Sequence, residues 1–220
     1  MRGATKAAAI ILAVLCVLLS SCELPGPWVT VFSDDFNRAD SDNVGNGWGE
    51  LPPVGDPPQL EKISGSALQM TGGSSSPYYA AITRTIYLEG DFRVTFDFSF
   101  PDPSAPTRAL LYVATADMDA DSGWYALGFI PGSLGIWKAI EALPGGVNPS
   151  LDASHPFTLE ILHAGAAFTV VLTDTATSDQ WTATSMDDTW QKFTTIHLKA
   201  GWYDSTAISV LIDDFVLQTR

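Results

Sequence analysis

Cysteine is almost absent from this chain of 220 residues, which has only Cys16 and Cys22, both near its start. Basic residues are also scarce: 11 lysines and arginines stand against 25 aspartates and glutamates, giving a net charge of −14. This balance argues against nucleic acid as a partner, because such affinity comes largely from Lys and Arg on phosphates. With no cysteine after residue 22, a disulfide framework and a thiol nucleophile are excluded there, so a core must stabilise the fold.

Several catalytic motifs are missing as well. There is no Gly-x-Ser-x-Gly, and the nearest piece, residues 131–135, begins with proline. The three histidines, His155, His163 and His197, lack the His-Glu-x-x-His spacing of a zinc hydrolase. After residue 22 no run longer than two turns has helical spacing, so no glycine-rich loop can precede a helix and hold phosphate.

The first residues have the pattern of an export signal. Arg2 and Lys6 precede an apolar or small run over residues 7–19. A basic segment followed by such a run is typical of a secretory signal peptide. The run is shorter than the roughly 20 residues that span a membrane as a helix. We therefore expect cleavage rather than a permanent transmembrane anchor.

The end of this run is Leu19-Ser20-Ser21-Cys22, which resembles the bacterial lipobox. The resemblance implies cleavage before Cys22 and several acyl chains on it, which anchor a protein durably. The alternative is an ordinary signal peptide with an incidental cysteine. Residue +2 is Glu23, not the aspartate linked with inner-membrane retention, so we expect the outer membrane if the host has two. We expect a signal peptide over 1–21, a tether over 22–28 and a single domain over 29–220.

Strand patterns dominate the rest of the chain. Residues 91–100 alternate strictly, with Phe or Val on one face and polar residues on the other, as in a strand with one buried face. Residues 157–161 and 168–172 repeat the pattern and predict a hairpin. Further strands are predicted at 29–36, 67–71, 79–88, 109–115, 124–130, 135–140, 180–184, 193–200 and 207–217. Pro and Gly clusters separate them, which indicates one all-β sandwich.

The order of these features resembles the concanavalin A-like lectin/glucanase superfamily, including laminin-G-like domains. The resemblance rests on residues 32–38 with Gly47-Trp48, on residues 87–92 and 123–129, and on the ending 208–217. It implies a jelly-roll sandwich of two antiparallel sheets whose first and last strands lie side by side. Many members bind glycans and some hydrolyse them, and fold alone does not decide between these. The hydrophobic phase breaks within 208–217, which predicts a β-bulge near Asp213-Asp214.

Two groups of acids are candidates for a structural calcium, the one cofactor that the sequence suggests. Asp117, Asp119 and Asp121 have the spacing of the start of an EF-hand loop. The glycine is one place late, and Gly128 stands where the bidentate glutamate belongs. The second group joins Asp34 or Asp35 to Asp213 or Asp214, with Asp35 and Asp214 as the favoured ligands, if the terminal strands pair as the resemblance implies. The alternative for both groups is solvated surface carboxylates.

Tryptophan gives the second set of candidates. In 124–130 the expected core residues alternate from Tyr125, which leaves Trp124 on the opposite face, and the same phasing leaves Trp137 opposite Ile136. Adjacent strands would place Trp124 and Trp137 together on one sheet face, where indoles can stack on sugar rings. The alternative is partial cover by a neighbouring loop. Trp202 and Tyr203 lie at a strand end and could line a rim, and Trp48 is expected in the core.

Three functions remain open. The favoured one is a non-catalytic, lectin-like domain, monomeric and membrane-anchored, that binds glycan or another cell-envelope ligand. The second is a glycoside hydrolase or lyase of the same fold. The glucanase motif Glu-x-Asp-x-x-Glu is absent, and Glu160 is a solitary strand glutamate expected on a solvated face. A hydrolase would therefore have to gather its carboxylates from separate strands. The third is a structural or adhesion protein that binds an envelope protein.

Overall fold

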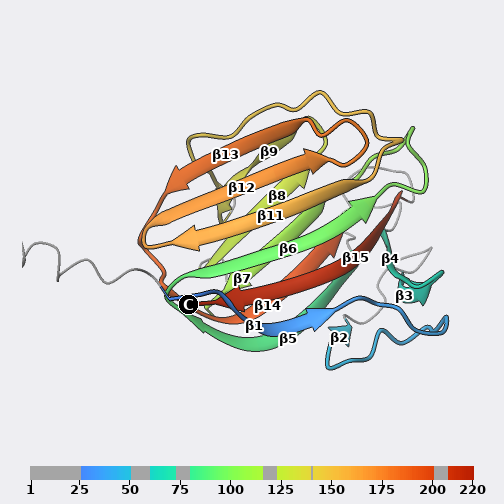
Figure 1. Cartoon of the computed structure of the whole chain (residues 1–220), viewed down its shortest axis with the longest axis horizontal. Coiled ribbons are helices and arrows are strands. Elements are labelled where there is room, and N and C mark those ends of the chain that lie inside the picture. Colours follow the sequence, from blue (N-terminus) through green and yellow to red (C-terminus); the bar gives the residue numbers. More distant parts are fainter. Residues whose placement is uncertain (1–25, 51–59, 73–79, 116–122, 140, 201–207) are drawn as a thin grey trace, which may run out of the picture.

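Two antiparallel β-sheets pack face to face and run across the whole molecule (Figure 1). The computed structural model describes residues 26–50, 60–72, 80–115, 123–139, 141–200 and 208–220. The eight-stranded sheet has the order β13-β12-β11-β6-β15-β4-β3, with β1 also paired to β15. The seven-stranded sheet has the order β10-β9-β8-β7-β14-β5-β2. The prediction of an all-β sandwich of two antiparallel sheets is confirmed.

The strands of the eight-stranded sheet are β1 (Val29–Asp34), β3 (Leu60–Ser64), β4 (Ala67–Gly72), β6 (Phe92–Ser99), β11 (Phe157–Ala164), β12 (Ala167–Asp174), β13 (Gln180–Met186) and β15 (Ile208–Thr219). Those of the seven-stranded sheet are β2 (Gly49–Glu50), β5 (Ala80–Glu89), β7 (Ala109–Ala114), β8 (Trp124–Ile130), β9 (Ser133–Lys138), β10 (Glu141–Ala142) and β14 (Lys192–Ala200). The short strands β2 and β10 and the strand β3 were not predicted.

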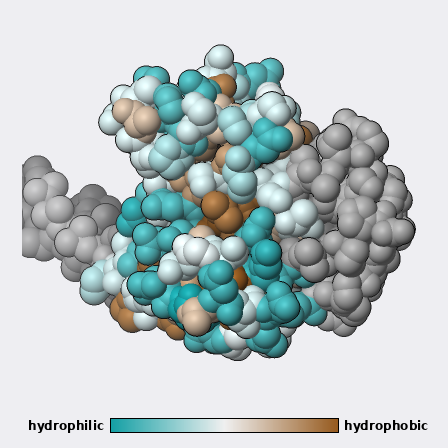
Figure 2. Space-filling model, turned by 90° about the vertical axis from the view of Figure 1, so that its right-hand side faces the viewer, coloured by the Kyte–Doolittle hydropathy of each residue, from teal (hydrophilic) through white to brown (hydrophobic). Residues whose placement is uncertain are grey.

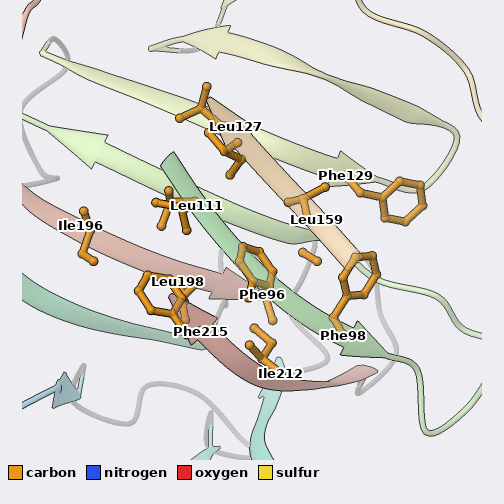
Figure 3. Close-up of a cluster of buried hydrophobic side chains, with 14 of the residues drawn as sticks. Phe96, Phe98, Leu111, Leu127, Phe129, Leu159, Ile196, Leu198, Ile212 and Phe215 are labelled. Atoms are coloured by element: carbon orange, nitrogen blue, oxygen red, sulfur yellow. The ribbon is translucent and has the colours of Figure 1, made fainter. Parts of the chain in front are cut away.

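The core lies between the sheets because each long strand turns alternate side chains inward. In β6, Phe92, Val94, Phe96 and Phe98 are buried and the residues between them are half-buried. Figure 3 shows Phe96 and Phe98 beside residues of the opposite sheet, among them Leu111 and Phe129. Aromatic rings pack closely here, and the ring centroids of Phe98 and Phe129 are 6.4 Å apart. The period-2 pattern therefore predicted the buried face of β6 correctly.

The first and last strands pair, as the resemblance implied. Within β1 and β15, Asp34 lies opposite Phe215 and Ser33 opposite Val216. The ladder between β15 and β6 shifts register between Asp213 and Val216, and Asp214 has a φ of 49°. This is the predicted β-bulge, and it turns Phe215 and Leu217 into the core.

β1 ends earlier than the sequence pattern predicted. The strand was expected to reach residue 36, but it stops at Asp34. The Asp34 carboxylate accepts a hydrogen bond from the Phe36 backbone N–H at 2.9 Å, and Phe36 has a φ of 48°. The same carboxylate accepts a hydrogen bond from the indole N–H of Trp48 at 3.0 Å, and Trp48 is buried in the core as expected. A turn closed by the Asp34 side chain therefore replaces the last residues of the predicted strand.

The N-terminal predictions lie outside the described residues. The signal segment, Cys22 and most of the tether belong to this part of the chain. In the ranges that the structure describes, no helix is long and apolar enough to cross a membrane.

Candidate functional site

A small second hydrophobic cluster lies on the outer face of the seven-stranded sheet, away from the core. Its buried centre is Leu110 and Tyr112 of β7 with Ala126 of β8. Trp124, Ile130 and Trp137 pack around this centre. We call these six residues the outer aromatic cluster.

Strand register brings its members together. Ala126 of β8 lies between Tyr112 of β7 and Trp137 of β9. The rings of Tyr112 and Trp124 are 5.1 Å apart between centroids, at an angle of 43°. Trp124 and Trp137 are both half-buried, so each indole keeps part of its surface open. The prediction that they share one face, opposite the core residue Tyr125, agrees with this geometry.

Strand β14 brings polar groups beside the cluster. His197 lies opposite Tyr112 in the ladder, and Lys199 lies opposite Leu110. The Lys199 ammonium stands 4.8 Å from the centre of the Tyr112 ring. Both side chains are largely buried, as is Tyr112. Tyr112, His197 and Lys199 are therefore covered, and of the aromatic rings of the cluster only the two half-buried indoles keep part of their surface open. Sequence phasing found the tryptophans but missed Tyr112, His197 and Lys199.

A hydrogen-bonded network fixes the strands that carry the two tryptophans. Asp187 accepts hydrogen bonds from the hydroxyl of Tyr125 (2.5 Å) and from Lys138 Nζ (2.9 Å). Tyr125 follows Trp124 on β8, and Lys138 follows Trp137 on β9. Burial would raise the pKa of Asp187, but the hydrogen bonds from Tyr125, Thr189 and Lys138 outweigh it and hold the pKa well below its usual range. The network thus ties β8 and β9 to the segment after β13.

The predicted acidic group at the terminal strands does come together. Asp35 and Asp214 both line a polar pocket of about 420 Å³ beside the β15 bulge, together with Asp34. Asp34 is already neutralised, because Arg38 donates to both of its carboxylate oxygens at 2.7 and 3.1 Å. In the described ranges, no group of three or more His, Cys, Asp or Glu side chains is arranged to hold a metal ion. Calcium at Asp35 and Asp214 therefore stays a prediction.

A carboxylate pair that sequence reasoning missed lies on the outer face of the eight-stranded sheet. Asp97 of β6 is directly opposite Asp213 of β15, and both line a small pocket of about 140 Å³. Burial raises the pKa of Asp213, and the carboxylates of Asp214, Asp35 and Asp97 raise it further. Thr158 donates a hydrogen bond to Asp97 at 2.6 Å. Only the register of two strands far apart in sequence reveals this pair.

The histidines and Glu160 have separate roles. His155 bonds the buried Asp174 at 2.7 Å, and this hydrogen bond raises the pKa of His155. His163 is a core residue whose ring lies 4.5 Å from that of Phe168. Glu160 is half-exposed and forms an ion pair with Arg93 at 2.8 Å, which agrees with its expected place on a solvated face.

Several predicted site residues lie outside the described ranges: Cys22, the calcium candidates Asp117, Asp119 and Asp121, and the rim candidates Trp202 and Tyr203.

Comparison with known proteins places the fold. No family model and no curated protein matches the sequence. Solved structures do match: peanut lectin with a nine-residue peptide has a TM-score of 0.63 at 11% identity, covering 88% of this chain and 98% of its own. Winged bean acidic lectin, complexed with methyl-α-D-galactose, has a TM-score of 0.61 at 10% identity over 85% of this chain and 97% of its own. Arcelin-5, a lectin-like defense protein from Phaseolus vulgaris, has a TM-score of 0.62 at 10% identity over 89% and 99%. This chain therefore has the concanavalin A-like sandwich fold of the legume lectins.

Proposed function

We propose that this chain is an exported lipoprotein, anchored by lipid on Cys22, whose lectin-like sandwich binds glycan without catalysis. The observation that carries the glycan-binding part is the outer aromatic cluster. Two half-open indoles on adjacent strands stand next to Tyr112, Lys199 and His197 on the same sheet face. The open part of the two indoles can stack on the C–H faces of sugar rings, while the buried side chains beside them support the strands that carry the indoles.

The anchor is supported by the sequence alone. A basic start, an apolar run of signal-peptide length and Leu19-Ser20-Ser21-Cys22 occur together. The acidic composition, with a net charge of −14, suits a protein held at a surface by lipid rather than by attraction to anionic headgroups. We place it on the outside of a bacterial membrane, the outer one if the host has two.

A glycan array tests the binding site. The full chain is compared with Trp124→Ala, Trp137→Ala and the control Tyr87→Ala, which removes an exposed aromatic from β5 of the same sheet. We expect binding to fall sharply in both tryptophan variants and to persist in the control. Binding that survives both tryptophan changes contradicts the platform. Absence of binding to any glycan would favour an adhesion protein with a protein partner.

The Asp97–Asp213 pair favours one alternative, a glycoside hydrolase. Residues directly opposite in an antiparallel pair have Cβ atoms about 5 Å apart. Retaining glycosidases hold their two carboxyl groups at about that separation, with a raised pKa on the acid. Asp213 would be the acid and Asp97 the nucleophile. Release of reducing sugar from an envelope glycan by the parent chain, lost in Asp97→Asn and Asp213→Asn, would establish this activity; no release by the parent chain excludes it.

A further inference from the structure

Four large hydrophobic side chains are exposed in the described part of the chain. Val29 is 57% exposed, Val31 47%, Tyr87 62% and Met186 69%. A single exposed apolar residue on a protein surface is ordinary. The arrangement of these four residues is unusual, because three separate strands bring them to the same end of the sandwich.

Strand register shows this. A line of cross-strand neighbours runs along one end of the eight-stranded sheet, through the pairs Val29–Thr219, Thr219–Phe92, Phe92–His163, Ala164–Ala167 and Ala167–Met186. Tyr87 belongs to the same end, because β5 stops at Glu89 and the chain enters β6 at Phe92. We call this end, where β1 begins, the tether end. In Figure 1 it lies on the left, where the C-terminus is marked.

The start of β1 is fixed to this end by the last residue of the chain. The Arg220 guanidinium lies 4.4 Å from the centre of the Trp28 ring. The same guanidinium forms an ion pair with the Asp91 carboxylate at 3.1 Å, and the backbone N–H of Arg220 donates a hydrogen bond to the Asp91 carbonyl. Trp28 is six residues after Cys22. Even fully extended, six residues span at most about 22 Å. The tether end is therefore the part of the sandwich that a lipid on Cys22 brings nearest to a bilayer.

The depth of the exposed side chains suits an interface. Val31 lies two residues beyond Val29, and Tyr87 two before Glu89, so each is within about 7 Å of its strand's end. Peripheral elements bury their apolar side chains about 5–10 Å into the headgroup boundary. Tyr87 also has the form favoured there, because its ring is exposed while its hydroxyl donates to Glu89 at 2.9 Å.

Part of the charge at the tether end is balanced within the protein, although Asp188, two residues after Met186, is exposed. Lys192 pairs with Glu89 at 2.6 Å, and Arg220 pairs with Asp91. Contact with lipid at this end therefore need not depend on anionic headgroups. Figure 2 shows the opposite end of the sandwich, and the coloured part of this view is mostly hydrophilic, with hydrophobic residues near its centre and at its lower left edge.

We propose that the tether end rests against the bilayer, with Val29, Val31, Tyr87 and Met186 in the interface and the opposite end directed away from it. The occupant of this surface is the lipid membrane that holds Cys22. The proposal rests on the lipid anchor of the proposed function, and adds a fixed orientation of the sandwich to it.

The test uses the full chain, processed in a bacterial host, purified in detergent and reconstituted into phosphatidylcholine vesicles that contain a spin-labelled phosphatidylcholine. Single cysteines are introduced as Tyr87→Cys, Met186→Cys and the control Ala176→Cys, and each carries an environment-sensitive fluorophore. Ala176 is exposed in the β12–β13 turn, at the end opposite Met186 on the same hairpin. Under the proposed processing Cys16 is removed and Cys22 is acylated, so the added thiol is the only free one.

We expect a blue shift and quenching by the spin-labelled lipid for probes at 87 and 186, and neither for the probe at 176. The result should be the same at high salt, because burial rather than charge attraction holds the contact. If all three probes behave alike, or those at 87 and 186 stay in water, the orientation is wrong.

A flotation assay separates this outcome from failure of the anchor. The parent chain should float with the vesicles, and Cys22→Ser should not. If the parent chain does not float, the lipid anchor is wrong and the orientation falls with it. If it floats while the probes at 87 and 186 report water, the anchor stands and only the orientation is overturned. Circular dichroism of each labelled variant checks that the sandwich has folded.

Discussion

Glu61 is a buried acid whose surroundings disfavour its charged form. It is 8% exposed on β3, and its Oε1 accepts the backbone N–H of Ala81 at 2.8 Å. Burial, with a smaller contribution from the nearby Glu50 carboxylate, raises the pKa of Glu61 to about 7. The folded state therefore holds a proton that the unfolded chain releases at lower pH, and this makes stability depend on pH.

The first prediction concerns this proton. The stabilising contribution is fully present below the unfolded pKa near 4.5 and is lost as pH rises through about 7. Glu61→Gln keeps the acceptor oxygen for Ala81 and removes the charge. We expect it to raise the free energy of unfolding at pH 8 by about 2–3 kcal/mol and to leave it nearly unchanged at pH 4. Denaturant titrations at both pH values measure this, and an equal effect at the two would contradict it.

The second prediction concerns Asp187, whose depressed pKa has the opposite sign. Its stabilisation is present above the unfolded pKa near 3.8 and is lost as pH falls through the lower folded pKa. Asp187→Asn removes the negative charge of the carboxylate that accepts hydrogen bonds from Tyr125 and Lys138. We expect a loss of about 1–2 kcal/mol at pH 7 and a smaller loss in acid. Asp188→Asn, at the exposed neighbouring position, is the control and should change little. Thermal unfolding at pH 7 and pH 3 compares the variants.

Among the elements, β15 is the strand whose irregularity organises the most of the fold. Its bulge at Asp213 and Asp214 returns Phe215 to the core and opens the pocket that Asp35 and Asp214 line. Asp214 adopts a φ of 49°, a conformation that glycine takes without steric cost.

The third prediction tests the bulge. Asp214→Gly should raise the free energy of unfolding by up to about 1 kcal/mol, because it relieves the left-handed conformation and reduces repulsion with Asp213. Asp213→Gly, one residue earlier in the strand, is the matched comparison. It also reduces the repulsion between the two carboxylates, but the conformational entropy that glycine loses in a strand offsets this gain in stability. Urea unfolding distinguishes them. A loss of stability in Asp214→Gly would show that the bulge does not need this conformation.

The sequence predicted elements well where one face is buried. The alternation in β6, β11 and β12 follows directly from hydrophobic burial, so the inward residues could be identified. The edge strands β2 and β10 have two residues each, too few to show a period. The bulge could be predicted from a break in phase, but the Asp97–Asp213 pair could not. It depends on which residue of β6 faces which residue of β15, and no local pattern contains that register.

The candidate site shows the same division. Phasing assigned Trp124 and Trp137 to one face, because each neighbours a core residue of its own strand. Tyr112 escaped notice because β7 is buried on both faces and its run has no polar alternation. His197 and Lys199 escaped notice because the end of β14 is likewise buried on both faces. A strand covered on both sides has no period from which a site residue can be recognised.

At the scale of the whole molecule, an excess of 14 negative charges bears on how calcium acts. Any cation screens the repulsion between so many acids, whereas a specific site stabilises the fold through mass action. We predict that saturating calcium raises the unfolding midpoint of the chain more than magnesium or sodium at equal ionic strength. The rise should shrink in Asp214→Asn if the ion binds beside the bulge, and in Asp119→Asn if it binds in the 117–121 group. Equal shifts with all three salts would leave only screening.

The pairing of β1 with β15 also has a mechanical consequence. A pull on Cys22 away from the sandwich enters the fold at Trp28 and runs along β1. The five register pairs between Val29 and Asp34 and their partners on β15 are then loaded together, in shear, rather than broken one after another. A sandwich held by lipid at one side and by a glycan at the other would carry tension through this ladder. Strand β1 would then transmit the mechanical force between the bilayer and the ligand.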